Sequence, residues 1–274
     1  LTAMAMYMMR EYRSDVLPNR NQGYSGRVTY DYASKYLVEF NFGYNGSERL
    51  AAGHRFEFFP AVSAGWVASS ENFWEPISKY INHFKIRGSY GLVGSDAFAS
   101  GAPHFLYQNN IGIGSAHNFW TGLPTSEISK KGPGFYVLAV QDAGWEHVKK
   151  FDIGFDMMLF NQLNITFDYF HDKRERILMS RASWPSMLGY WGSKPWSNIG
   201  EVENQGFELS LNWTKQFGKD LTLDLRGNFT YNQNEYKYVD EPSYPYVWQT
   251  NTGKPLNTCL LYTSPSPRDR SLSR

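Results

Sequence analysis

The 274-residue sequence predicts an all-β fold, namely a fragment of a large transmembrane β-barrel with about nine antiparallel strands. Three observations predict this class. Apolar and polar residues alternate with a period of two along most of the chain, which is typical of strands with two different faces. The alternating segments run for about 10 residues, the length that a tilted strand needs to cross a bilayer. Short turns and long polar loops alternate between them, as in outer-membrane barrels.

The strands are predicted one by one from this alternation. Between residues 36 and 45 every second residue is apolar, namely Tyr36, Val38, Phe40, Phe42 and Tyr44. The same criterion places strands at residues 1–10, 24–33, 36–45, 57–68, 84–94, 145–160, 163–172, 206–214 and 220–232. Because bacterial single-chain barrels close with an even number of strands, an odd number indicates an open piece of a larger barrel.

Connections of two lengths separate these strands. Short turns are expected at residues 33–35, 161–162 and 215–220, and long loops at residues 45–57, 95–144, 173–205 and 233–257. Residues 69–83 form a longer connection on the short-turn side, for which we expect one helical turn and a rim contact by Trp74. Aromatic residues near the strand ends, such as Tyr30 and Trp66, fit the interfacial girdles of a membrane barrel.

Composition agrees with a membrane barrel and excludes other classes. Aromatic residues make up 17% of the chain and charged residues 19%, whereas a soluble domain has ~25% charged residues. The mean hydropathy is −0.50, which a barrel with a wet interior allows because only every second residue faces lipid. No apolar run reaches the ~18 residues of a membrane-spanning helix. The formal net charge of +1 predicts no nucleic-acid partner.

Alternation alone does not exclude a soluble protein, since the strands of a β-sandwich alternate in the same way. The alternative interpretation is a β-rich surface module that binds carbohydrate without transporting it. Two sheets packed face to face would support this alternative, whereas one curved sheet with an apolar outer face supports the barrel.

The two ends of the chain differ from the rest. Residues 3–9 have no basic segment before them and no small-residue cleavage site, so we interpret them as a strand of an incomplete barrel and not as a signal peptide. Residues 259–269 (CLLYTSPSPRD) match the translation of a sequencing-library adapter, and they include the single cysteine, Cys259. The sequence thus predicts a partial barrel over residues 1–258 and a non-native, disordered tail over residues 259–274. The alternative is a Ser/Pro/Arg-rich disordered tail.

No motif predicts catalysis, and we expect that the protein is not an enzyme. The six histidines are scattered without the His-Glu-x-x-His spacing of a zinc site. The Gly-x-Gly at residues 112–114 lacks the strand and helix that surround it in a dinucleotide site. We therefore predict no catalytic, cofactor-binding or metal-binding residues, and we interpret the inward carboxylates as the lining of a polar lumen.

The loop at residues 180–198 contains the candidate binding residues. Trp184, Tyr190, Trp191 and Trp196 lie there among Gly, Ser and Pro residues. Exposed aromatic rings offer apolar faces to a sugar ring or to a partner protein, so these four residues are the candidate contacts to a ligand or partner. The competing interpretation, which we favour, is that they pack the loop onto itself or join the aromatic girdle.

Several segments resemble the barrel of SusC-like TonB-dependent outer-membrane transporters of Bacteroidota, the SusC/RagA family. The most specific is FFPAVSAGW at residues 58–66. The other segments, in the order expected for the family, are GRVTYDY at 26–32, FNFGYNGSE at 40–48, KIRGSYG at 85–91 and NIGEVENQGFEL at 198–209. The resemblance extends over nearly all of residues 1–258.

This resemblance implies a protein of the Gram-negative cell outer membrane whose complete barrel has about 22 strands around an N-terminal plug. It implies nutrient uptake energised by the TonB complex, a SusD-like lipoprotein as extracellular partner, and glycan or peptide as cargo. Outer-membrane lipid would surround the barrel. Because the sequence contains neither a plug nor a TonB box, TonB would act through a missing N-terminal part. The fragment alone is expected not to transport.

Overall fold

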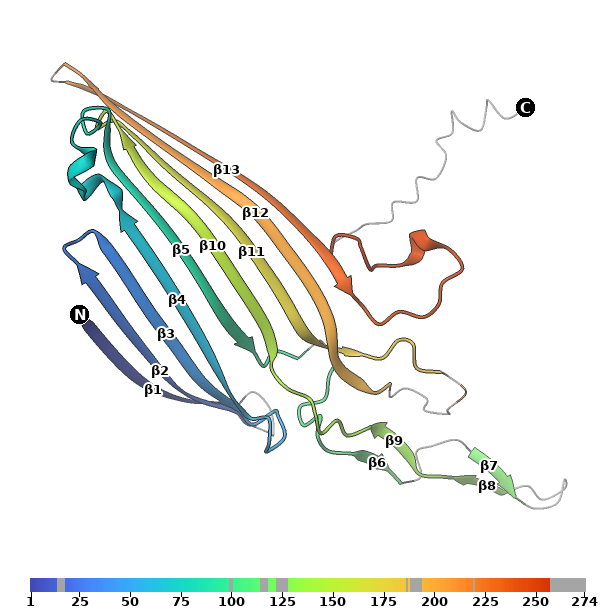
Figure 1. Cartoon of the computed structure of the whole chain (residues 1–274). Helices are drawn as coiled ribbons and strands as arrows, with labels where there is room; N and C mark the ends of the chain where they lie inside the picture. The colour runs from blue at the N-terminus through green and yellow to red at the C-terminus, as the bar shows by residue number, and fades with distance from the viewer. Residues whose placement is uncertain are drawn as a thin grey trace, which may run out of the picture.

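The computed structural model describes residues 1–13, 18–98, 101–113, 118–121, 128–185, 187, 194–218 and 220–256. Its main element is a nine-stranded sheet with the strand order β1-β2-β3-β4-β5-β10-β11-β12-β13, in which every neighbouring pair is antiparallel (Figure 1). The strands are β1 (Thr2–Arg13), β2 (Pro18–Tyr32), β3 (Tyr36–Ser47), β4 (Phe56–Val67), β5 (Ile81–Ser95), β10 (Glu146–Leu159), β11 (Leu163–Ser180), β12 (Trp196–Phe217) and β13 (Leu221–Tyr238). The sheet confirms the predicted all-β barrel fragment.

The segment between β5 and β10 does not join the large sheet. It forms two small hairpins, in which β6 (Asn110–Gly112) pairs with β9 (Gly134–Val137) and β7 (Asn118–Thr121) pairs with β8 (Ile128–Lys131) (Figure 1). Short 3-10 helices are found at η1 (Ala68–Ser70), η2 (Asn72–Trp74) and η4 (Val247–Gln249). In the described ranges, no helix has the length and apolar character needed to cross a membrane.

The two faces of the large sheet differ in chemistry, as the alternation predicts. On β3, Val38 and Phe40 are 47% and 43% exposed, whereas Glu39 and Asn41 are half-buried. On β3 the apolar face is thus the more exposed one, the reverse of a soluble protein, in which apolar side chains are the most often buried. On β12 the order is different, because Phe207 and Leu209 are half-buried and Glu208 and Ser210 are exposed. A single large sheet accounts for all nine strands, which agrees with a barrel wall and not with two sheets packed face to face.

A row of phenylalanine rings crosses the apolar face of five neighbouring strands. The ring centroids are 6.0 Å apart for Phe84 and Phe155, 5.6 Å for Phe155 and Phe167, 6.1 Å for Phe167 and Phe207, and 5.7 Å for Phe207 and Phe229. Cross-strand aromatic pairs of this kind stabilise antiparallel sheets. The row therefore links β5 to β13 through side chains in addition to the backbone ladder.

The short turns at residues 33–35 and 161–162 lie at one end of the sheet, which we call the turn end (Figure 1). Ala33 and Ser34 both have φ of 54°, and Phe160 and Asn161 have φ of 52° and 55°. Two consecutive residues with positive φ are typical of type I′ turns, whose twist matches that of the flanking strands. The Asp31 carboxylate also accepts a hydrogen bond from the Ser34 N–H at 2.7 Å. The turns predicted at residues 33–35 and 161–162 are therefore confirmed, whereas the turn predicted at residues 215–220 is wrong over residues 215–217, which belong to β12.

The longer connection at the turn end contains η1 and η2, where the sequence predicted one helical turn. Trp74 Nε1 donates a hydrogen bond to the carbonyl of Ile81 at 3.0 Å. Its ring stacks on Phe84 with a centroid distance of 5.4 Å and an interplanar angle of 6°. Trp74 therefore fixes this connection against β5, in agreement with the predicted rim contact.

Glu71 ties the same connection to the start of β3. Lys35 Nζ and the Tyr36 hydroxyl donate hydrogen bonds to its carboxylate at 3.0 and 2.8 Å. These bonds, first that from Lys35 and then that from Tyr36, hold the pKa of Glu71 below its usual value. The carboxylate is therefore ionised at neutral pH and stabilises the connection as an anion.

At the opposite end, which we call the loop end, β11, β12 and β13 are longer than predicted. β11 spans 18 residues and β12 spans 22, so the predicted loop at residues 173–205 is wrong for most of its length. β13 extends to Tyr238, so the loop predicted at residues 233–257 is wrong over residues 233–238. Charged pairs connect the strands there: Lys149 Nζ lies 2.6 Å from Glu175 Oε2, and Lys237 Nζ lies 2.9 Å from Glu203 Oε2. Because the pairs are charged, apolar alternation stops although the strands continue.

Candidate functional site at the loop end

Four segments occupy the loop end, and only their described residues are considered: these lie within residues 48–55, between β5 and β10, between β11 and β12, and within residues 239–256 (Figure 1). Binding residues are concentrated in loops that a rigid scaffold positions. The type I′ turns at the turn end are too short to form a site of their own. The loop end is therefore the candidate functional site.

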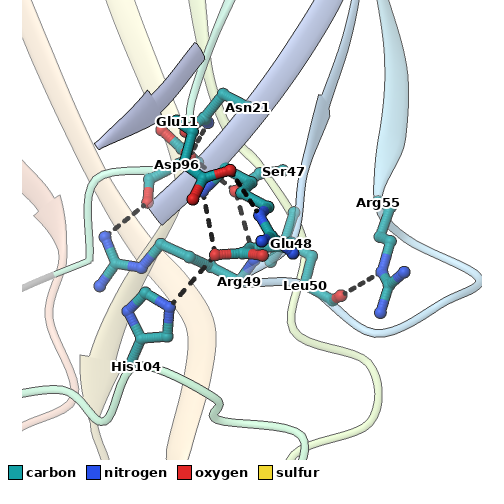
Figure 2. Close-up of polar contacts among 10 residues, drawn as sticks. Glu11, Asn21, Ser47, Glu48, Arg49, Leu50, Arg55, Asp96 and His104 are labelled. Carbon is teal, nitrogen blue, oxygen red and sulfur yellow. Dashed lines mark hydrogen bonds and ion pairs between the residues drawn. The ribbon is translucent and has the colours of Figure 1, made fainter. Parts of the chain in front are cut away.

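Asp96, at the start of the longest segment, is tied to two strands beyond β4 (Figure 2). Its Oδ2 accepts hydrogen bonds from Asn21 Nδ2 at 2.6 Å and from the Ser47 hydroxyl at 2.7 Å. Its main-chain carbonyl accepts a bond from Arg49 Nη1 at 3.3 Å, and the Arg49 guanidinium lies 4.2 Å from the ring centroid of Phe98. These contacts direct the segment that leaves β5 back toward β2 and β3.

Glu48 forms a second tether beside the first (Figure 2). Its Oε1 accepts a hydrogen bond from the Arg20 main-chain N–H at 2.9 Å, and Arg20 Nε donates to Glu11 Oε2 at 3.2 Å. His104 Nε2 lies 3.7 Å from Glu48 Oε1. Asp96 and His104 thus attach the segment after β5 at two points to residues of β2 and β3 and of the connection after β3.

β4 and β5 separate toward the loop end. Their backbone pairing ends at Ala61 and Gly91, whereas β5 and β10 stay paired as far as Ser95 and Glu146. We call this separation the seam. In the described structure, side chains rather than backbone pairs close it.

An apolar cluster fills the seam. Phe59 is only 6% exposed, and its ring meets the ring of Trp145 edge-on at a centroid distance of 5.4 Å. Leu50 is buried in the same cluster. The Phe59 ring lies over Gly94, where an added Cβ would be 2.0 Å from Phe59 Cζ. Gly94 is therefore needed for the close approach of this ring.

Polar contacts also cross the seam. Trp145 Nε1 donates a hydrogen bond to the carbonyl of Arg55 at 3.0 Å. His147 Nε2 lies 2.7 Å from Glu57 Oε1, and Arg176 Nη1 lies 3.8 Å from the same oxygen. Side chains of β10 and β11 are thus joined directly to β4.

Asp240 joins the segments that follow β11 and β13. It is 7% exposed and accepts hydrogen bonds from the Ser183 N–H at 3.1 Å, the Ser183 hydroxyl at 2.8 Å and Arg181 Nε at 3.2 Å. Burial alone would raise the pKa of Asp240, but the bonds from Ser183 and Arg181 outweigh it and hold the pKa below its usual value. Asp240 is therefore an ionised anchor at neutral pH.

The structure places two of the four predicted contact residues. Trp184 is half-buried in the turn after β11. Trp196, the first residue of β12, packs against a buried apolar cluster. The buried members of that cluster are Leu106, Ala143 and Leu178. Tyr190 and Trp191 lie outside the described residues. The packing of Trp196 agrees with the interpretation that these aromatics pack the loop, and their role in ligand or partner binding stays a prediction.

The predicted polar loop at residues 233–257 contains two aromatic residues that are not among the predicted site residues. Tyr246 and Trp248 are each 58% exposed, and their ring centroids are 5.6 Å apart with an interplanar angle of 14°. A signal was present in the sequence, because Tyr244, Tyr246 and Trp248 alternate within a loop.

The polar face of the sheet carries an ion-pair cluster away from the loops. The Arg87 guanidinium lies 3.6 Å from Asp152, 3.2 Å from Asp156 and 2.7 Å from Asp168. One guanidinium between three carboxylates leaves an excess of negative charge, as expected for the lining of a wet lumen. In the part of the chain that the structure describes, no group of three or more His, Cys, Asp or Glu side chains is arranged to hold a metal ion.

Comparison with known proteins shows what this chain is similar to. A family model described as TonB dependent receptor-like, beta-barrel matches residues 10–270. The chain is 32% identical over 211 residues to TonB-dependent receptor P3 of Formosa agariphila, and the matched region covers 77% of this chain and 20% of that protein. It is 27% identical over 239 residues to TonB-dependent receptor SusC of Bacteroides thetaiotaomicron, and the matched region covers 83% of this chain and 22% of that protein.

Solved structures share the fold. The RagAB peptide importer in the closed-closed state matches 80% of this chain and 22% of its own with a TM-score of 0.64 at 20% identity. The siderophore receptor PirA from Pseudomonas aeruginosa matches 81% of this chain and 35% of its own with a TM-score of 0.50 at 11% identity. The chain spans about a fifth of the length of the curated relatives it matches. The SusC-like resemblance is thus confirmed, and the chain belongs to the TonB dependent receptor-like, beta-barrel family of outer-membrane proteins.

Proposed function

We propose that the chain is a wall segment of an outer-membrane nutrient importer of the SusC type. The observation that carries the proposal is the exposure pattern of β3, in which the apolar Val38 and Phe40 are more exposed than the polar Glu39 and Asn41. Such an apolar surface is stabilised by lipid and not by water. Membership of the TonB dependent receptor-like family supports the same assignment.

In this proposal each part of the sheet has a distinct contact. The apolar face contacts outer-membrane lipid, the polar face around Arg87 lines the lumen, and the loop end faces the cell exterior, because long loops of outer-membrane barrels are extracellular. A SusD-like lipoprotein binds at the loop end, and the cargo is a glycan or a peptide. The TonB complex supplies energy through another part of the longer protein.

The chain by itself is proposed to be inactive in transport. β1 and β13 are the edges of the sheet, and β13 pairs outward only where Tyr236 bonds to residues 253 and 254 in the described structure. In hydrocarbon every backbone polar group needs a partner, so a barrel must close. Further strands are therefore needed. The division into a barrel at residues 1–258 and a non-native tail at 259–274 is part of the proposal, since residues 257–274 lie outside the described ranges.

Deletion of the gene for the full-length protein tests the proposal. Growth of the deletion strain is compared with the parent strain on single glycans and on peptides as the nutrient source. We expect loss of growth on at least one source, restored by the full-length gene but neither by a version without its TonB-contacting segment nor by this chain alone. Unchanged growth on every source, or rescue that does not depend on TonB, would contradict the proposal.

The alternative function is a surface module that binds carbohydrate without transporting it. The same strains distinguish the two functions. If the protein is a binding module, cells of the deletion strain lose adhesion to the glycan, while the growth of the strains stays independent of TonB. Members of the family are transporters and not enzymes, so we propose no catalytic role for the chain.

A further inference from the structure

The connection between β4 and β5 carries apolar side chains that the sheet does not bury. Phe73 is 60% exposed, Ile77 is 43% exposed and Tyr80 is 62% exposed. We call these three residues the apolar ridge. Exposure of large apolar side chains to water is unfavourable, and a group of them on a protein surface is typical of contact with a membrane or with another protein.

The apolar ridge lies along one side of two helical turns. Its members are four and three residues apart, the spacing that places side chains on one side of a helix. The backbone makes these turns, because the Ser78 N–H donates a hydrogen bond to the carbonyl of Trp74 at 3.0 Å and the Ile81 N–H donates one to the carbonyl of Ile77 at 3.0 Å. The apolar ridge is therefore one continuous surface.

The other side of these turns is polar. Asn72, Glu75 and Lys79 are exposed, and their spacing places them opposite the apolar ridge. Glu75 and Lys79 carry opposite charges, so this side has no net charge. A segment with one apolar and one polar side is typical of a segment that lies in the plane of a membrane surface.

The apolar ridge is on the side of the sheet that carries the phenylalanine row. The ring centroids of Phe73 and Trp66 are 6.4 Å apart. Trp66 is on the same face of β4 as the exposed Val62, because side chains alternate along a strand. Trp74, the neighbour of Phe73, stacks on Phe84 of the row. The connection therefore folds over the apolar face of the sheet and not over its polar face.

The turn between β10 and β11 holds the apolar ridge in place. The Phe160 N–H donates a hydrogen bond to the carbonyl of Tyr80 at 2.9 Å, and the two rings meet edge-on with their centroids 6.0 Å apart. The Asn161 N–H donates a hydrogen bond to Asn82 Oδ1 at 2.6 Å. Because the ridge is positioned in advance, little conformational entropy is lost when a partner covers it.

The position of the apolar ridge keeps it on the outer surface of a closed barrel. β4, β5 and β10 are inside the strand order, away from the edge strands β1 and β13, and the helical turns lie beside β4 and β5 at the turn end (Figure 1). Strands that complete the barrel join its edges, and anything in the lumen contacts the polar face. Neither of them covers the ridge.

We propose that the apolar ridge inserts into the boundary between the headgroups and the acyl chains of a phospholipid leaflet, and that it holds the wall at a fixed depth in the membrane. The ridge is continuous with the apolar face, which contacts lipid in the proposed function, so lipid covers both. Tyr80 combines an apolar ring with a hydroxyl, and such side chains are enriched at membrane interfaces. The assignment to the periplasmic leaflet rests on the proposed function, which places the loop end outside the cell.

Fluorescent labels at single cysteines test the insertion. The full-length protein that contains this chain, with its other accessible cysteines replaced by serine, is reconstituted into vesicles of phosphatidylethanolamine and phosphatidylglycerol. The label at Phe73→Cys should emit at a shorter wavelength than in water, be quenched by lipids brominated near the headgroup end of the acyl chains, and lose most of its quenching by aqueous iodide. Lys79→Cys on the polar side is the matched control, and its label should stay accessible to iodide.

Ile77→Cys replaces Phe73→Cys if the latter does not fold, which circular dichroism shows. Equal quenching by iodide at the apolar ridge and at Lys79 would overturn the inference. A ridge label that becomes shielded in detergent as the protein concentration rises, without quenching by brominated lipid, would indicate that a second copy of the protein covers the ridge. That result would overturn the inference as well.

The depth of the wall is measured with a label at Val62→Cys, on the apolar face of β4. Phe73→Ser together with Tyr80→Ser should shift the position of bromine along the acyl chain that quenches this label most strongly. Asn72→Ser together with Lys79→Ser is the matched control and should leave that position unchanged. An unchanged position in the ridge variant would overturn the role of the ridge in fixing the depth.

The inference and the proposed function fail in different ways. TonB-dependent growth together with a ridge label that iodide quenches freely would remove the membrane contact of the ridge and leave the transporter. Quenching of the ridge label by brominated lipid, together with growth that is independent of TonB, would keep the membrane contact and remove the transporter.

Discussion

The two-residue turns at the turn end are fixed by backbone geometry, whereas the segments at the loop end are fixed by side chains from distant parts of the chain. The type I′ turns at Ala33–Ser34 and Phe160–Asn161 need only a local change of φ. At the loop end, Asp96 contacts Asn21 and Asp240 contacts Ser183, which are far apart in the sequence.

We therefore expect the stability of the two ends to respond differently to substitution. A turn determined by local conformation tolerates most side-chain changes, because its neighbours contribute little to it. A segment held by long-range contacts loses several interactions at once when one anchor is removed. The following four predictions test this difference, in decreasing order of effect.

Phe59→Ala is expected to have the largest effect. Truncation of this buried ring leaves a cavity against Trp145 and should reduce the free energy of local opening at the seam by about 3–5 kcal/mol. Hydrogen exchange of residues 56–61 and 91–95 in the full-length protein measures it. Val62→Ala on the same strand is the control, since Val62 is 47% exposed. Equal effects of the two substitutions would show that the seam is not closed by Phe59.

Gly94→Ala tests the same seam by adding a methyl group. The added Cβ would meet the Phe59 ring at 2.0 Å, so the ring must move, at a cost of about 1–3 kcal/mol. The near-ultraviolet circular dichroism of Trp145 and the exchange of β4 should both change. Gly227→Ala is the matched control, because its Cβ would meet nothing within 4 Å. A Gly94 variant with unchanged spectra would contradict the close packing described for the seam.

Asp240 and Glu71 allow the two ends to be compared by pH. Both carboxylates have a folded pKa below the usual value. Their stabilisation is therefore present at neutral pH and is lost as the pH falls through the folded pKa. At the loop end, Asp240→Asn should reduce the free energy of local opening of residues 239–256 by about 1–3 kcal/mol at neutral pH. The hydrogen-exchange protection of these residues should also depend less on pH.

Glu71→Gln is the counterpart at the turn end, where the carboxylate is bonded to Lys35 and Tyr36. It should affect the exchange of residues 68–80 without changing that of residues 239–256. An unchanged pH response in the Asp240 variant would show that this residue is not the anchor of its segment.

Ala33→Gly is expected to have the smallest effect, and in the opposite direction. Ala33 has φ of 54°, which glycine adopts without steric cost, so the substitution should stabilise the turn by up to about 1 kcal/mol. Ala64→Gly, in the interior of β4, should instead destabilise by about 0.5–1 kcal/mol. Thermal unfolding of the two variants in parallel shows whether each substitution raises or lowers the stability of the protein. Destabilisation of equal size in both would contradict the turn geometry.

The nine strands and the turns could be predicted from the sequence because each depends on local pattern. Alternating apolar residues mark the part of a strand that has one apolar face, as in residues 36–45. The extensions of β11 and β12 could not be predicted in this way, since Glu175 and Glu203 pair with lysines there. A charged cross-strand pair leaves no apolar period in the sequence.

The candidate site was less predictable because it depends on contacts between distant residues. Nothing in the local sequence indicates that Asp240 bonds to Ser183 or that Phe59 lies over Gly94. The aromatic loop residues were identifiable by type, but Trp196 proved to pack against a buried cluster. The exposed rings of Tyr246 and Trp248 occur in a loop that had been predicted by length alone.

The short pairing of β4 with β5, from Val67 and Lys85 to Ala61 and Gly91, has a mechanical consequence. It divides the wall into two plates, β1–β4 and β5–β13, that a backbone ladder joins only near the turn end. Nearer the loop end the plates are joined by side chains such as His147 and Glu57. The width of the wall at its mouth is therefore set by side-chain contacts and not by a backbone ladder.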